Sequence, residues 1–192
     1  MATALPFTNT KKELHFPKLA TFYDRVAQPF AWVALRFTAG AILVVQSIPL
    51  IKDPLSMASF FEGIGFLPGH VWSVTLLIVQ VVGGALLALG LYTRPAAFAV
   101  GVMLLVTLWF HLAHPFDNQL ITSAGLQVLT AGPDMLTQTG YTLLKDGGRH
   151  FAELAQGKAE LLSLFWAGIA FLYAAFGGGY LSLDRMILRK RY

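Results

Sequence analysis

Long apolar runs alternate with short polar segments along this chain. Mostly apolar residues occupy about 27–50, 71–92, 95–112 and 160–176. A helix needs about 20 apolar residues to cross the hydrocarbon core of a bilayer. An open strand edge there would leave backbone groups without partners, so each run is predicted to be a helix. The pattern therefore predicts an all-α fold, an integral membrane four-helix bundle.

The polar segments between and around these runs complete the predicted organisation. In residues 1–26, Phe16, Leu19 and Val26 recur at helical spacing among Lys and Arg, which is typical of a short helix on the membrane surface. Residues 113–159 are predicted to form a long outer connection between the third and fourth spans, with one or two short helices. Residues 177–192 form a basic tail. We expect 1–192 to be a single membrane domain, and no internal repeat is apparent.

The distribution of Lys and Arg predicts the orientation in the membrane. Nine of these cations precede the first span, follow the fourth or lie in the turn between the second and third, whereas four lie in the other two connections. Cytoplasmic segments of membrane proteins carry the excess of Lys and Arg. Both termini are therefore predicted to be cytoplasmic, in a protein of the bacterial inner membrane.

The amino-acid composition indicates the surroundings of the chain and excludes several kinds of chemical site. The chain is 56% hydrophobic and 12% charged, and it contains no cysteine. Soluble domains carry about a quarter charged residues, so the lipid bilayer is the predicted surrounding. Without cysteine, disulfides, thiolate metal sites and thiol-based redox chemistry are excluded. The net charge of +4 is explained by the ends of the spans, and no nucleic-acid partner is predicted.

Each predicted span carries one polar group in its middle or outer half, counted at helical rise from the flanking charges or glycines. These groups are Arg36, Gln80, His111 and Glu160. An ionisable side chain at such a depth is costly unless it has a partner, so it suggests a functional site. Gln80 shares a helical face with Gly83 and Gly84, where small residues let another helix approach closely. We therefore expect the four side chains to face the bundle interior.

Structural interpretations of the same residues stay open. Arg36 would then be a cation that bonds backbone carbonyls and Gln80. His111 and His114 would be interfacial residues at the outer end of a span, and Glu160 would be an ordinary acid in the first turn of a helix. Two histidines and one glutamate do not suffice to predict a metal site, so none is predicted.

Several short segments resemble the DoxX family of small bacterial membrane proteins. They are Leu35-Arg36 before a glycine-containing apolar span, GLYTRPA at 90–96, AELL at 159–162 and GGGYLSLDR at 177–185. The resemblance covers about 27–112 and 158–187. The family usually has Glu at the position of Gln80, so a proton carrier is missing here, and the outer connection is longer than in the family.

The resemblance implies that the protein is associated with redox enzymes of the membrane. The family takes its name from a subunit of a quinone-linked thiosulfate-oxidising system, and other members are associated with redox-stress complexes. The bundle is also similar to that of vitamin K epoxide reductase, whose cysteine chemistry cannot apply here.

Two functions are expected in comparable measure. The chain is either a non-catalytic accessory subunit or a quinone-interacting subunit of a membrane redox or energy-converting complex, with other membrane-protein subunits docking through residues 115–157. In the second case the polar cluster would hold ubiquinone or menaquinone, and no covalent cofactor is expected. Any enzymatic role would then be that of a quinone-linked oxidoreductase subunit. The alternative is a stand-alone small-solute transporter or exporter.

Overall fold

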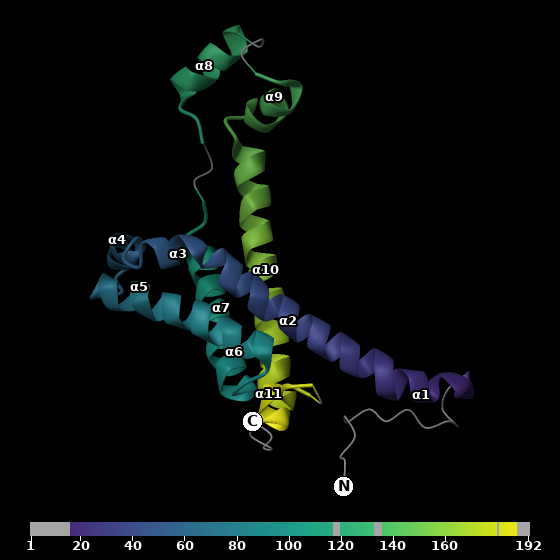
Figure 1. The fold of residues 1–192 in the computed structure, drawn as a ribbon. Helices are drawn as coiled ribbons and strands as arrows, with labels where there is room; N and C mark the ends of the chain where they lie inside the picture. Colours follow the sequence, from purple (N-terminus) through teal and green to yellow (C-terminus); the bar gives the residue numbers. More distant parts are fainter. Residues whose placement is uncertain (1–15, 117–119, 133–135, 180, 188–192) are drawn as a thin grey trace. The chain divides into compact units, whose positions relative to one another are not determined.

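A computed structural model describes residues 16–116, 120–132, 136–179 and 181–187 (Figure 1). Every regular element in these ranges is a helix. Four helices are long and apolar enough to span a membrane, namely Ala20–Gln46, Gly69–Leu89, Thr93–Ala113 and Arg149–Phe176. The predicted all-helical class with four spans is confirmed.

The spans are built from the following elements. The first comprises α1 (Ala20–Phe22), the π-helical η2 (Tyr23–Ala27) and α2 (Gln28–Gln46), after the 3₁₀ turn η1 (Pro17–Leu19). The second comprises α5 (Gly69–Ile78), the π-helical η3 (Val79–Gly83) and α6 (Gly84–Leu89). The third is α7 (Thr93–Ala113) and the fourth is α10 (Arg149–Phe176). Shorter helices are α3 (Ile48–Lys52), α4 (Ala58–Gly63), α8 (Ser123–Ala131), α9 (Gln138–Leu144) and α11 (Leu183–Met186).

The helices divide into two compact units. Unit 1 contains the residues up to Met103 together with those from Ala167 onward, and unit 2 contains Leu104–Trp166. Unit 1 thus holds the first two spans, the start of the third, the end of the fourth and the segment after it. Unit 2 holds the outer connection and the helix ends that border it.

Two spans begin earlier than the apolar pattern suggests. The segment predicted to lie on the membrane surface is continuous with the first span from Ala20. Pro29 has no N–H to donate to the preceding turn, and that turn is π-helical, which lets the helix continue. The fourth helix begins at Arg149 because good helix formers and an Arg149–Glu153 ion pair extend it beyond the apolar run. Apolarity marks the membrane part of a helix, not its polar extension.

Asp146 precedes the start of α10 and satisfies backbone donors there. Its carboxylate accepts hydrogen bonds from the N–H groups of Gly148, at 3.1 Å, and His150, at 3.0 Å. The bond from His150 is the main reason why the pKa of the Asp146 carboxyl lies below its ordinary value. This cap helps to explain why the fourth helix starts well before its apolar part.

Helices α2 and α6 pack against each other through glycines. A Cβ atom on Gly40 would lie 2.8 Å from Cβ of Ala88 and closer still to the carbonyl oxygen of Gly84. A Cβ atom on Gly84 would in turn lie 3.0 Å from the carbonyl oxygen of Gly40. The close approach predicted for the face of Gly84 is therefore confirmed, and Gly40 is its partner. We call this contact the glycine seam.

The outer connection contains two short helices, as predicted. Both begin in the same way, because the Thr122 and Thr137 side chains accept hydrogen bonds from the N–H groups of Gly125 and Gly140. The two Thr-x-x-Gly segments reveal a short internal repeat that the sequence reading overlooked. Each of the two helices is therefore capped by the threonine that directly precedes it.

The glycine seam predicts the effect of adding one methyl group. Gly40→Ala is expected to lower the free energy of unfolding by about 1–3 kcal/mol, because α2 and α6 must move apart. Gly168→Ala is the matched control, since a Cβ atom there meets nothing within 4 Å and alanine favours a helix. Denaturation in detergent micelles measures both. Equal stability of the two variants would contradict the seam.

Candidate functional site

Arg36 on α2 is the centre of a buried polar cluster in unit 1. The residue is only 2% exposed. Its guanidinium donates hydrogen bonds to the carbonyl oxygens of Gly178, at 2.5 Å, and Leu181, at 3.2 Å. The planar fork of an arginine suits two acceptors of this kind. Arg36 therefore joins the first span to the segment that follows the fourth.

Three glycines after α10 allow this approach. The helix ends at Phe176, as the glycine run predicted, and Gly177 and Gly179 have positive φ angles. A Cβ atom on Gly178 would lie 3.0 Å from the Arg36 guanidinium, and one on Gly179 would lie 2.5 Å from the Trp32 ring. The segment thus follows the surface of α2 closely because it lacks side chains there.

Trp32 and Tyr173 add a second contact beside Arg36. The Trp32 indole donates to the carbonyl oxygen of Gly177 at 3.0 Å, and the Tyr173 hydroxyl donates to the carbonyl oxygen of Trp32 at 2.6 Å. The two rings pack edge to face at 5.0 Å. These bonds hold the end of α10 to α2.

Asp184 on α11 occupies the start of α7. It is 1% exposed and accepts hydrogen bonds from Tyr92 N at 2.6 Å, Thr93 N at 2.9 Å and Thr93 Oγ1 at 2.7 Å. A carboxylate is favoured at a helix N-terminus, where backbone N–H groups lack partners. The bond to Tyr92 helps to hold that residue at a positive φ of 46°. We call Arg36, the glycine run and Asp184 the clamp.

Gln80 lies elsewhere in unit 1, in the π-helical turn η3, and pairs with Ser47. Ser47 Oγ lies 3.0 Å from the Gln80 side-chain oxygen and 2.6 Å from the carbonyl oxygen of Leu43. A hydroxyl has one hydrogen, and the shorter contact takes it. The Gln80 amide is then best oriented with its NH₂ group toward Ser47, since the two ends of an amide are assigned from their bonds.

His111 and Glu160 meet in unit 2 through a third residue, Gln156. The Gln156 amide donates to the carbonyl oxygen of His111 at 2.5 Å and to Glu160 at 2.6 Å. Its oxygen accepts from Phe116 N at 3.2 Å. Nδ1 of His111 is buried and has no hydrogen-bond partner in the described part of the chain. We call His111, Gln156 and Glu160 the Gln156 cluster.

Comparison with known proteins identifies the region that holds most of these groups. Residues 31–113 match the DoxX family model. This region of the chain is similar to the DoxX family. It covers the glycine seam, Arg36, Gln80 and His111, whereas the rest of the clamp and of the Gln156 cluster lie beyond it. Neither the curated proteins nor the solved structures contain a match to the chain.

Within the region that matches DoxX, Arg36 and Gln80 make hydrogen bonds to different partners and do not form one cluster. Arg36 bonds backbone carbonyls, as one of the two interpretations expected, but the described partner of Gln80 is Ser47. The predicted depth of Arg36 is also wrong. It lies against Gly90, at the end of α6, and against the end of α10, because the first helix already begins at Ala20 and its flanking charges do not mark the membrane edge.

His111 and Glu160 lie together in unit 2, because the Gln156 amide donates to the backbone carbonyl of His111 and to the Glu160 carboxylate. His114 is exposed, and its ring stacks on Phe110 at 4.9 Å. The sequence reading missed Asp184 and Gln156 as site residues. Asp184 stands in the GGGYLSLDR segment, and Gln156 stands one helical turn before Glu160. Their positions in the sequence could have pointed to them, but neither lies within a predicted apolar span, where a polar residue would stand out.

The three hydrogen bonds that Asp184 accepts at the start of α7 predict a large loss of stability when its carboxylate is replaced. Asp184→Asn places an NH₂ group among three donors, so we expect the free energy of unfolding to fall by about 1–3 kcal/mol. Asp53→Asn is the control, because Asp53 is exposed and accepts only from Leu55 N among the described contacts of its side chain. Unfolding in detergent micelles measures both variants. A fall no larger than that of the control would refute the capping role.

Gln80 gives a prediction with a pH dependence. Gln80→Glu supplies a donor to Ser47 Oγ only while its carboxyl group is protonated. The variant is therefore expected to approach wild-type stability at low pH and to lose stability as the pH rises and the proton leaves. Gln46→Glu is the control, since Gln46 is exposed. A stability profile of Gln80→Glu that is parallel to that of the control would show that no donor is needed.

Proposed function

We propose that this protein is a non-catalytic accessory subunit of a redox complex in the bacterial inner membrane. The carrying observation is that Arg36, the charge within the first span, has its two terminal nitrogens committed to backbone carbonyls of the same chain. These two nitrogens stabilise packing and are not available to a substrate. The third nitrogen, Nε, is buried and has no hydrogen-bond partner among the described residues. The similarity to the DoxX family, and the resemblance to subunits of redox systems, support the membership in a complex.

The orientation belongs to the same proposal. Both termini would lie on one side of the membrane if all four candidate helices cross it, and the excess of Lys and Arg favours the cytoplasm for that side. The clamp would then face the cytoplasm. Docking of other subunits through residues 115–157 would occur outside the cytoplasm.

A second candidate is contact with a quinone at the Gln156 cluster. The observation that favours it is the buried Nδ1 of His111, which is without a partner although Phe116 packs against the same ring at 6.1 Å. A buried imidazole nitrogen suits a quinone carbonyl or quinol hydroxyl, and Glu160 could exchange a proton nearby. A bound quinone would supply the redox chemistry, while His111 and Glu160 would orient it.

Affinity purification of the full chain from its own membrane separates the two candidates. For an accessory subunit, we expect wild type to retain a defined protein partner. Arg36→Lys is expected to lose that partner, because a lysine lacks the planar guanidinium fork whose two nitrogens reach the two carbonyls. Glu160→Gln should retain the partner and the activity of the complex. Arg94→Lys, at an exposed position, is the control.

Native mass spectrometry of the same samples supplies the opposing results. A quinone bound to wild type and lost in Glu160→Gln, together with loss of activity, would favour the second candidate. Full activity of the isolated chain would contradict the accessory role. Retention of the partner by Arg36→Lys at wild-type level would remove the observation that carries the proposal.

A further inference from the structure

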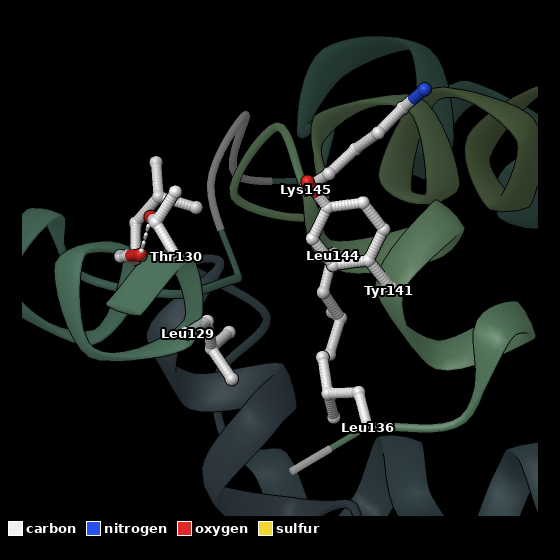
Figure 2. A pocket seen from close by; sticks show the side chains of 7 residues that line it. Leu129, Thr130, Leu136, Tyr141, Leu144 and Lys145 are labelled. Atoms are coloured by element: carbon white, nitrogen blue, oxygen red, sulfur yellow. Dashed lines mark hydrogen bonds between the residues drawn. The ribbon is translucent and has the colours of Figure 1, made fainter. Parts of the chain in front are cut away.

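The small cavity lined by residues of α8 and α9 has room for about one water molecule. Its volume is about 20 Å³, and Leu129 and Tyr141 are among the side chains that line it (Figure 2). It therefore does not hold a small-molecule ligand. Exposed apolar side chains lie elsewhere, on the connection between the first two spans at residues 53–68.

A series of aromatic rings extends from α4 in this connection to the start of α5. The ring centroids of Phe60 and Phe61 lie 5.6 Å apart, and those of Phe61 and Phe66 lie 6.2 Å apart. Phe66 in turn packs edge to face on Trp72 at 5.1 Å. Between residues 54 and 69, Glu62 is the only charged residue of the sequence. A segment with apolar and aromatic side chains and one charge suits the boundary between lipid headgroups and acyl chains.

The connection is held against the first turns of α5. A Cβ atom on Gly69 would overlap the carbonyl oxygen of Ala58, so α4 and the start of α5 approach closely. Ser73 is fully buried, and its hydroxyl donates a hydrogen bond to the carbonyl oxygen of Pro54 at 2.6 Å. All of these residues belong to unit 1. The connection thus lies beside the first turns of α5 and does not project from the end of the helix.

The length of the second span gives the depth of these contacts. The span from Gly69 to Leu89 has 21 residues and measures about 32 Å, close to the thickness of the hydrocarbon core. It uses its full length to cross, so Gly69 lies at the edge of the core, and a tilt of the helix moves it deeper. Ser73 is roughly 6 Å further along the helix. Pro54 is held at the level of Ser73, within reach of the acyl chains.

We propose that the connection at 53–68 is a lipid-interface anchor, with Leu55 and Leu67 in contact with the acyl chains of the leaflet where α5 begins. In the single chain these side chains are 54% and 70% exposed. They continue the exposed apolar surface of Val71 and Trp72 at the start of the second span. Lipid that surrounds the span therefore also covers the connection. The anchor fixes the depth at which the second span enters the membrane.

Spin labels on single cysteines measure this depth directly. The chain has no native cysteine, so Leu55→Cys and Leu67→Cys each carry one label. The purified full chain is studied in liposomes. We expect both labels to collide more often with oxygen, which dissolves in lipid, than with a water-soluble nickel chelate.

Two further labels provide the references. Ile78→Cys is the lipid reference, because Ile78 is exposed in the middle of the second span. His150→Cys is the water reference, because His150 is exposed at the start of α10, which has 28 residues and is about 12 Å longer than the hydrocarbon core. Collision with the chelate at the rate of His150→Cys would place the connection in water and overturn the proposal. Little collision with either reagent would show a cover of protein and would overturn it too.

The reactivity of the same cysteines provides an independent measurement. The thiolate is the reactive form, and apolar surroundings keep a thiol protonated. In liposomes, Leu55→Cys and Leu67→Cys are expected to react with N-ethylmaleimide at least about tenfold more slowly than His150→Cys. The reagent crosses membranes, so the side of the membrane does not matter. The three rates should become equal after unfolding in SDS, whereas equal rates in liposomes would contradict the anchor.

Discussion

The burial of the Arg36 guanidinium is the constraint on which the rest of unit 1 depends. A charge at this position is tolerated only if acceptors replace water, and the carbonyl oxygens of Gly178 and Leu181 do so. Their approach requires that Gly90 and Gly178 carry no side chain. Asp184 follows in the same segment and caps α7. One charge thus connects the first span, the turn before the third and the segment after the fourth.

The buried polar groups of the chain are of two kinds, those that hold helices together, as Arg36 does, and those that could contact a ligand. Those of the clamp, with Ser47 and Gln80, make hydrogen bonds that hold helices together, as an accessory subunit requires, although Nε of Arg36 is buried without a partner among the described residues. The Gln156 cluster retains a buried imidazole nitrogen without a described partner, and unlike Nε of Arg36 this nitrogen can accept a hydrogen bond as well as donate one, so we propose it as the position for contact with a ligand. Packing and contact with a ligand are then carried by different residues.

The sequence predicted what depends on local physics. Apolar length predicted four spans, small residues predicted the glycine seam at Gly84, and the glycine run predicted the end of the fourth helix. The predicted depth of Arg36 is wrong because it counts from Arg25, which lies inside the first helix and does not mark the membrane edge. The roles of Asp184 and Gln156 depend on partners distant in the chain, and neither polarity nor spacing identifies such partners. Their hydrogen bonds emerge only from the folded chain.

Hydrogen–deuterium exchange of the full chain, compared between wild type and Arg36→Lys, tests the dependence on Arg36 most directly. In wild type, the amides of Tyr92, Thr93 and Asp184 donate to Asp184 or Gly90 and should exchange slowly. If the clamp depends on Arg36, exchange in the variant will accelerate both at 90–93 and at 181–187, with α8 and α9 unchanged. Equal exchange of these two segments in both proteins would contradict the account.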